Sequence, residues 1–321
     1  MAIITTYDLC LNREGRRAVD KVDISIEPGE IFGILGPTGC GKSSLLHILA
    51  GLLPPSSGTA VVNDFDVLTQ QERVRRSVGV MFQEVFIDDW LTAREVLDLH
   101  AQLQGLPRGT REKRIESLLS QLGLAEKSGV AVRYFTPLKK RKLALARAVV
   151  HSPEVLILDE PTSGLPREQQ NEFWATLIKV NANFKIGMVI ATSSWEECEK
   201  LCDRTVLMDR GSIVRQGTQE ALKDSIGGST VVLQLDRHSP RLAESIRALW
   251  FVKDVAASEK TIEITMVPNQ EQVNKITSLV KRFPVNIVAM TMHKPTLNDV
   301  FYKHTGSFLE DAGSDLSGRT R

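Results

Sequence analysis

A glycine-rich segment between an apolar run and a helical pattern constrains this chain more than any other feature. Residues 31–35 predict a buried strand, and residues 44–50 predict a helix that ends at Gly51. Between them the chain reads G-x-x-x-x-G-K-S, made by Gly36, Pro37, Thr38, Gly39, Cys40, Gly41, Lys42 and Ser43. The N–H groups of such a loop and the N-terminus of the following helix attract phosphate. This context predicts a phosphate-binding loop, with Ser44 in its contact set, rather than an ordinary glycine turn.

Residue types within this loop and after a second apolar run suggest the chemistry. We expect Lys42 to reach the β- and γ-phosphates of a nucleoside triphosphate and Ser43 to ligate Mg²⁺. The run 155–158 predicts a strand that ends in Asp159 and Glu160. Asp159 is predicted to hold Mg²⁺ through its water shell, and Glu160 is the predicted catalytic residue, which polarises the attacking water. The alternative is a strand that ends in two solvated acids.

The bulk numbers exclude several classes of protein. The 321 residues can form more than one domain, and a net charge of +1 gives no basic field for nucleic acid. The sequence has no apolar run near the ~18 residues that span a bilayer and no secretory pattern at its start. Four cysteines without a C-x-x-C pair favour a reducing, cytosolic compartment. We expect Cys198 and Cys202 to be buried, with a bridge or a metal site as the alternative.

The pattern of elements predicts two domains. Residues 1–222 alternate between strand and helix patterns and predict a layered α/β domain. Residues 228–306 predict the order β-α-β-β-α-β of a small α+β, ferredoxin-like domain. Residues 307–321, rich in Gly, Ser, Asp and Arg, predict a disordered tail.

Further motifs give the first domain a specific resemblance. The runs 160–165 (E-P-T-S-G-L) and 142–148 (K-L-A-L-A-R-A), with the phosphate loop and Asp159-Glu160, resemble ATP-binding cassette (ABC) ATPases, the motor subunits of membrane transporters. The resemblance implies a P-loop NTPase domain with a mixed sheet and a helical subdomain at about 84–150. It implies ATP and Mg²⁺ as cofactors, and a role for Gln83 in contacting Mg²⁺ and water and in relaying motion to the membrane subunit.

The same resemblance implies partners and a location. In this family two ATPase subunits sandwich two ATP molecules, each held by one subunit's phosphate loop and the other's signature loop. The partners would be an integral membrane permease and a second ATPase, at the cytoplasmic face of the membrane, with no nucleic acid. Residues 293–301, followed by Thr305-Gly306, resemble the end of daunorubicin-resistance-type exporter ATPases.

Four positions depart from the family pattern. The signature L-S-G-G-Q corresponds to residues 135–139 (F-T-P-L-K), where Pro137 has no N–H to donate and Lys139 and Lys140 are alternative sources of charge. Pro166 replaces the aspartate after Ser-Gly-Leu and also suits the start of a helix. Ser193 stands where the switch histidine is expected, and the neighbouring Glu196-Glu197 predict a solvated helix start. The aromatic that would stack on adenine is missing, so Arg13 or Arg16 could stack instead.

These departures fall on functions of the dimer interface and of the switch. Our leading hypothesis is therefore the degenerate half of an asymmetric ATPase pair in an exporter, with low activity of its own. A non-hydrolytic regulatory or scaffolding subunit is the second hypothesis. A soluble cassette that acts on nucleic acid or ribosomes is the third, and the near-neutral charge and the extra domain count against it.

Overall fold

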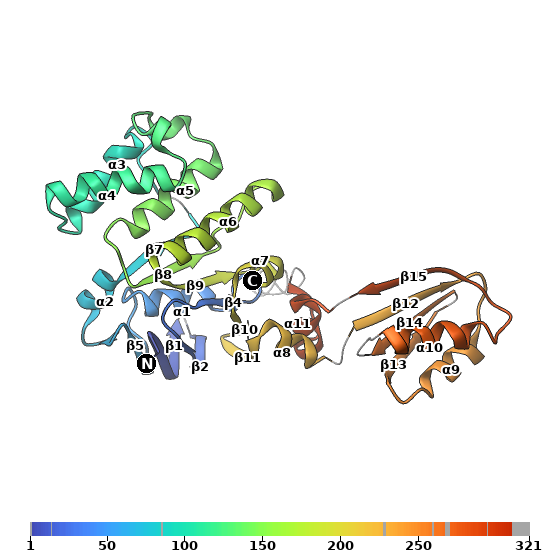
Figure 1. The fold of residues 1–321 in the computed structure, drawn as a ribbon. Helices are drawn as coiled ribbons and strands as arrows, with labels where there is room; N and C mark the ends of the chain where they lie inside the picture. Colours follow the sequence, from blue (N-terminus) through green and yellow to red (C-terminus); the bar gives the residue numbers. More distant parts are fainter. Residues whose placement is uncertain are drawn as a thin grey trace. The chain divides into compact units, whose positions relative to one another are not determined.

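The computed structural model describes residues 2–13, 15–84, 86–226, 229–258, 260–266, 270–293 and 295–309 (Figure 1). These residues divide into two compact units, the first ending at Gln216 and the second running from Gly217 to Phe308. Helix α8 (Gln219–Asp224), which the sequence assigns to the first domain, groups with the second unit. Most of the predicted tail, residues 310–321, lies outside the described residues.

A six-stranded sheet forms the centre of the first unit. Its order is β11 (Ser212–Thr218), β10 (Arg204–Asp209), β4 (Ile31–Leu35), β9 (Gly187–Thr192), β8 (Val155–Asp159) and β7 (Val78–Met81). The pairs from β10 to β7 are all parallel. Every residue of β4, β8 and β9 is buried, as continuous apolar runs predict for central parallel strands. The carboxyl ends of four neighbouring strands, β4, β9, β8 and β7, therefore share one edge of the sheet.

A second, antiparallel sheet packs on the same core. Its order is β2 (Arg16–Val22), β1 (Ile4–Arg13), β5 (Ser57–Val62) and β6 (Phe65–Asp66), and β3 (Ser25–Ile26) also pairs with β1. Apolar side chains of both sheets and of helix α1 (Lys42–Leu49) form one buried cluster. This cluster anchors the loop between β4 and α1.

The remaining helices of the first unit complete its layers. They are α2 (Gln71–Ser77), α3 (Ala93–Leu103), α4 (Arg108–Gln121), α5 (Pro137–Val149), α6 (Arg167–Phe184) and α7 (Trp195–Leu201), with short 3₁₀ turns at Ala125–Lys127 and Val132–Tyr134. Helices α3, α4 and α5 lie together in Figure 1, and α3 packs against both of the others. Helix α3 begins at a capping box in which Thr92 and Glu95 bond each other's backbone N–H.

The second unit contains a four-stranded antiparallel sheet. The chain runs β12 (Ser229–Leu235), α9 (Pro240–Arg247), β13 (Val252–Ala257), β14 (Thr261–Met266), α10 (Gln270–Val280) and β15 (Ile287–His293), the predicted order of elements. The sheet order is β13-β14-β12-β15. Helices α9 and α10 lie on one face of the sheet (Figure 1), where apolar side chains form a separate core. Helix α11 (Leu297–Thr305) packs against α8. Of the helices described, none has the length and apolar character that crossing a membrane requires.

Candidate nucleotide-binding site

The loop between β4 and α1 depends on glycine at two points. Gly41 has a φ of +113°, and a Cβ there would lie 2.0 Å from the carbonyl oxygen of Ala18. A Cβ on Gly36 would lie 2.2 Å from the carbonyl oxygen of Met208. Only glycine therefore fits at either position. The loop turns sharply, α1 begins at Lys42, and Thr38 and Gly39 form an exposed tip.

Lys42 is held inside this loop. Its side chain is 5% exposed, and Nζ donates to the carbonyl oxygens of Gly36 at 2.7 Å and Pro37 at 3.1 Å. The same Nζ lies 3.3 Å from Oε1 of Glu160, the residue that follows β8. The structure thus brings the predicted phosphate-binding lysine and the predicted catalytic acid into one ion pair.

Asp159 has the features of a metal-binding carboxylate. It is 6% exposed at the end of β8, and among the described residues Oδ1 has no hydrogen-bond partner. Burial raises the pKa of Asp159 and Glu160 adds to this effect, while a hydrogen bond with Ser43 and the charges of Lys42 and His47 oppose it. A buried carboxylate oxygen without a partner, beside a serine hydroxyl, suits a hard cation that prefers oxygen ligands. Asp159 and Ser43 therefore fit Mg²⁺.

The metal would need ligands from the nucleotide as well. Within the described ranges, no three His, Cys, Asp or Glu side chains cluster so as to hold a metal ion. Mg²⁺ commonly takes one or two protein ligands together with substrate phosphates. The donor set therefore fits a metal that arrives with a triphosphate.

Glu160 stands in a constrained position after β8. Its φ is +45°, unusual for a residue with a side chain, and its N–H donates to the carbonyl of Ala191 at 2.8 Å. Its Oε2 accepts from Ser193 Oγ at 3.3 Å, and Thr192 Oγ1 lies 3.5 Å away. Ser193, which replaces the expected histidine, thus contacts the acid directly. Backbone and side chain together aim the carboxylate towards the phosphate loop.

Gln83 follows β7 at the same edge, but its amide is not bound at the site. The residue is exposed, and the amide makes no hydrogen bond within the part of the chain that the structure describes. The backbone carbonyl oxygen of Gln83 instead accepts from Arg141 at 2.8 Å, and Arg141 also donates to the backbone carbonyl of Ser163 at 3.0 Å. The metal role assigned to Gln83 remains a prediction.

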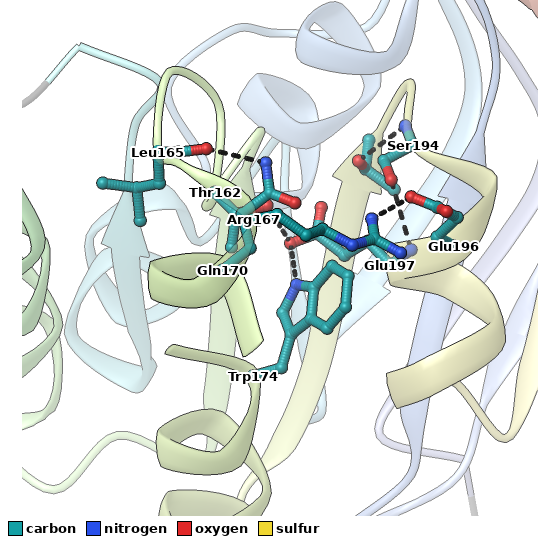
Figure 2. A network of polar contacts seen from close by, with 9 residues as sticks. Thr162, Leu165, Arg167, Gln170, Trp174, Ser194, Glu196 and Glu197 are labelled. Atoms are coloured by element: carbon teal, nitrogen blue, oxygen red, sulfur yellow. Dashed lines mark hydrogen bonds and ion pairs between the residues drawn. The ribbon is translucent and has the colours of Figure 1, made fainter. Parts of the chain in front are cut away.

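The prediction of a solvated start to α7 is wrong for Glu197. Glu196 is half-exposed and pairs with Arg167, but Glu197 is only 1% exposed. Glu197 Oε1 accepts from Thr162 Oγ1 at 2.7 Å and from Trp174 Nε1 at 2.9 Å (Figure 2). Two adjacent acids at a helix start predict solvent exposure, but Trp174 of α6, which is distant in sequence, covers Glu197. The only indication in the sequence is that Glu197 lies next to Cys198 and one helical turn before Leu201, on the side of α7 that is buried.

The segment that matches the family signature begins α5. Thr136 caps the helix by accepting from the N–H of Lys139 at 3.4 Å, and Pro137 occupies its first turn. Leu138 is 8% exposed, so its side chain packs inwards rather than blocking the surface. Lys140 pairs with Asp89 at 2.6 Å. Thr136 is exposed at this turn, and Lys139 is half-buried.

The cysteines do not take part in these contacts. Cys198 and Cys202 are buried, as predicted, and none of the four cysteines forms a disulfide bond in the described structure. Cys40 is buried within the phosphate loop, and burial raises the pKa of its thiol to about 11, although Lys42 opposes the shift. The Cys40 side chain therefore fills space beneath Gly36 as a neutral group.

The strand order, the glycine loop and the acid pair define a nucleotide-binding domain of the P-loop class, and comparison with known proteins specifies its family. The family model described as "ABC transporter" matches residues 19–163. The chain is 31% identical to the linearmycin resistance ATP-binding protein LnrL of Bacillus subtilis, over 92% of this chain and 96% of that protein. It is 30% identical to the daunorubicin/doxorubicin resistance ATP-binding protein DrrA of Streptomyces peucetius, over 97% of this chain and 95% of that protein.

A solved structure supports the same conclusion. The fold resembles that of cbiO1 from Clostridium perfringens, part of the ABC transporter complex cbiONQ, with a TM-score of 0.63 and 26% identity. That match covers 70% of this chain and 94% of the other. The chain therefore belongs to the ATP-binding proteins of ABC transporters.

Proposed function

We propose that this chain binds Mg-ATP and drives export of a substrate through a membrane permease. The observation that carries the proposal is the meeting of Lys42, Glu160 and Asp159 at the carboxyl ends of β4 and β8, two parallel strands with β9 between them. The direction of transport is supported by the names of relatives matched along nearly the whole chain, which describe resistance to linearmycin and to daunorubicin and doxorubicin. The permease would hold the chain at the cytoplasmic face of the membrane.

Each residue of the site has a defined task in this proposal. The loop N–H groups and Lys42 would bind the β- and γ-phosphates, displacing Lys42 from the carbonyls that it now contacts. Ser43 and Asp159, with Gln83, would hold Mg²⁺, which neutralises phosphate charge as the bond to the leaving group breaks. Glu160 would orient and polarise the attacking water. Ser193, within 3.3 Å of that carboxylate, would steady its orientation but could not titrate near neutral pH as histidine does.

The segment after Gln83 is the surface that we assign to the permease. The side chains of Phe86 and Trp90 are each 74% exposed, an unusual state for large aromatic residues. The backbone of this segment is nevertheless anchored, because Arg147 donates to the carbonyl of Phe86 at 2.6 Å and the N–H of Arg133 donates to the carbonyl of Asp89 at 3.0 Å. The Arg133 guanidinium also lies 4.3 Å above the Trp90 ring. An anchored segment with exposed aromatic groups suits a docking surface better than a disordered loop.

We further propose that the chain works in an asymmetric pair with a second, different ATPase. Its own phosphate loop and Glu160 would face the partner's intact signature loop, while residues 135–139 would face the partner's phosphate loop. Pro137 offers no N–H there, and loss of one preorganised donor costs about 3 kcal/mol in such sites. The site completed by this chain's signature segment would therefore turn over slowly, and this chain by itself would have low activity.

Two finer assignments accompany this function. The β-α-β-β-α-β order and the sheet order β13-β14-β12-β15 support a ferredoxin-like domain in the second unit. Dimer contact or regulation is the role that we propose for it, by analogy of fold alone. Base stacking is proposed for Arg13 or Arg16, whose side chains are exposed at one end of the β1–β2 pair.

A non-hydrolytic scaffolding subunit is the second candidate, favoured by Ser193, Pro137 and Pro166 at positions of the switch and interface. The assembled complex decides between the two. Glu160→Gln should abolish hydrolysis at one of the two sites and lower transport by at least about 10²-fold, the usual weight of a general base. The matched control is Glu154→Gln, an exposed acid at the opposite end of β8. Unchanged transport in the Glu160→Gln complex would establish scaffolding and reject the enzymatic role.

A further inference from the structure

A buried acid outside the nucleotide site joins three separate segments of the first unit. Glu197 lies in α7, and its Oε1 accepts hydrogen bonds from Thr162, in the loop after Glu160, and from Trp174 in α6. Figure 2 shows Glu197 between these two donors. Its carboxyl group also shares a hydrogen bond with Thr192, the last residue of β9. The loop 161–165, the switch strand and α6 therefore meet at one carboxyl group.

The same contacts lead to the catalytic acid in two steps. Thr192 Oγ1 lies 3.5 Å from Oε2 of Glu160 and also accepts from the N–H of Ser194 at 3.0 Å. Ser194 caps α7 by accepting from the N–H of Glu197 at 3.3 Å. A displacement of Thr162 would therefore reach Glu160 through Glu197 and Thr192. The covalent path between Thr162 and Glu160 is short and stiff, because Pro161 lies between them and Glu160 itself has a left-handed backbone.

Stability alone does not account for a carboxyl group at this position. Burial raises the pKa of Glu197, opposed by the donors Thr192, Thr162 and Trp174. Apolar side chains of similar volume often stabilise a core as well as a buried charged group does, or better. A carboxyl group, unlike an apolar side chain, accepts directional hydrogen bonds from several segments and so fixes the positions of these segments relative to one another.

The loop 161–165 has further attachments that match this role. Gln170 donates to the carbonyl of Leu165 at 2.9 Å, and Arg141 donates to the carbonyl of Ser163 at 3.0 Å (Figure 2 shows the first). Gly164, with φ at +77°, makes the turn between these two points. Thr162 is itself only 3% exposed, whereas Ser163 and Gly164 are exposed. One end of the loop is thus fixed inside the fold while its tip faces outwards.

We propose that Glu197 is a positioning residue for hydrolysis, which holds the loop 161–165 and the end of β9 in the register that aims Glu160. The role rests on the proposed function, since it supposes that Glu160 acts on water and that the loop tip meets a partner. Contact of a partner with the exposed loop tip would then set the position of the Glu160 carboxylate, although Glu197 itself would not touch the nucleotide.

Two single variants and their combination test the proposal in the assembled transporter. Glu197→Gln keeps the size of the side chain but turns one acceptor into a donor, and Thr162→Val removes one donor. Each should lower kcat between about 10- and 100-fold, the usual cost of misplacing a catalytic group, with the KM for ATP within about twofold of wild type. The double variant should lose no more than the worse single variant, because both break one connection.

The matched control is Glu196→Gln, which alters the neighbouring acid on the surface and should leave kcat unchanged. A purely structural role would lower the melting temperature and the ATP affinity together with kcat, and that result would overturn the proposal. Unchanged kcat in Glu197→Gln, or independent losses that multiply in the double variant, would also overturn it. If Glu197→Gln does not fold, Thr162→Val decides alone by the same kcat and KM criteria.

A second readout separates this proposal from the proposed function. Hydrogen exchange of the peptide spanning 160–166, measured on the full chain without partners, should be at least about tenfold faster in Glu197→Gln than in Glu196→Gln. A wild-type transporter without ATP turnover would contradict the proposed function, and exchange would still decide whether Glu197 holds the loop. Equal exchange in the two variants would show that it does not.

Discussion

The residues that we propose to bind nucleotide (the cradle) and those that we propose to face a partner form two contrasting regions of the first unit. In the cradle, Lys42 and Asp159 are buried, and Lys42 is held by two carbonyls and by Glu160. In the region that we propose to face a partner, Ser163 and Gly164 are exposed and Lys139 is half-buried. The residues proposed for the first region all come from this chain, whereas those proposed for the second would act on the nucleotide of another subunit. Pro137 and Pro166, which we interpret as departures from the family pattern, belong to the second region.

The largest effect should come from the cradle. Lys42→Ala leaves the phosphate charge without its buried cation and leaves Glu160 without its ion-pair partner. ATP affinity measured by calorimetry should fall at least about 10²-fold, since charge-assisted hydrogen bonds to phosphate are among the strong ones. Lys142→Ala, which breaks only a surface pair with Glu172, is the control. Equal affinity of Lys42→Ala and wild type would reject the phosphate-loop assignment.

A change in the partner-facing region should act in the opposite direction. Pro137→Gly restores an N–H at the first turn of α5 and should raise ATP turnover of the assembled pair, by up to about 10²-fold at the site that it completes. Pro240→Gly makes the same replacement in the first turn of α9 in the second unit and should not change turnover. Equal rates in both variants would show that Pro137 does not limit the partner's site.

The Arg141 side chain connects the two regions by hydrogen bonds to backbone carbonyls, and its removal should have a smaller effect. Arg141→Ala removes donors to the carbonyls of Gln83 and Ser163 and should destabilise the fold by about 1 kcal/mol, because the guanidinium is partly exposed. Denaturant unfolding of the purified chain measures this change, with ATP affinity unaltered. A loss of ATP affinity as large as that of Lys42→Ala would mean that the two regions are not separable.

The smallest effect concerns the thiol inside the cradle. With a pKa raised to about 11 by burial, Cys40 carries roughly one thiolate per thousand molecules at pH 8. A thiol reagent should therefore modify the half-buried Cys10 first, and labelling of Cys40 should speed up about tenfold per pH unit up to the pKa. ATP should slow it further. Cys10→Ser isolates the slow phase, and labelling of Cys40 as fast as that of Cys10 would contradict its burial.

The strands and the helix around the proposed cradle can be predicted from the sequence because each is encoded locally. A strand, a glycine loop and a helix follow one another without a break, and an apolar strand that ends in Asp159-Glu160 carries its own boundary signal. The order of elements in the second unit was also readable, since turn residues separate each apolar run from the next. The sequence patterns do not predict the position of each strand in its sheet, because strand order depends on pairing between residues far apart in the chain.

Two errors show where local reasoning fails. The alternation of residues 22–26 suggests a single strand, but β2 ends at Val22 and β3 begins at Ser25. The Thr6 hydroxyl donates to the carbonyl of Val22 at 2.7 Å and accepts from the N–H of Ile24 at 3.0 Å, so a side chain interrupts the ladder. Glu197 was likewise misassigned because the residues that bury it, Thr162 and Trp174, are distant in sequence. Both cases depend on tertiary contacts that no window of residues contains.

We propose that this chain supplies the phosphate-binding and catalytic residues of one ATP site but a signature segment that serves the partner's site poorly. Affinity purification of the tagged chain from detergent-solubilised native membranes, with its companions identified and counted, tests it most directly. We expect one copy of this chain, a second and different ATPase with an L-S-G-G-Q loop, and permease subunits. Two copies of this chain with a permease, hydrolysing ATP rapidly, would contradict it.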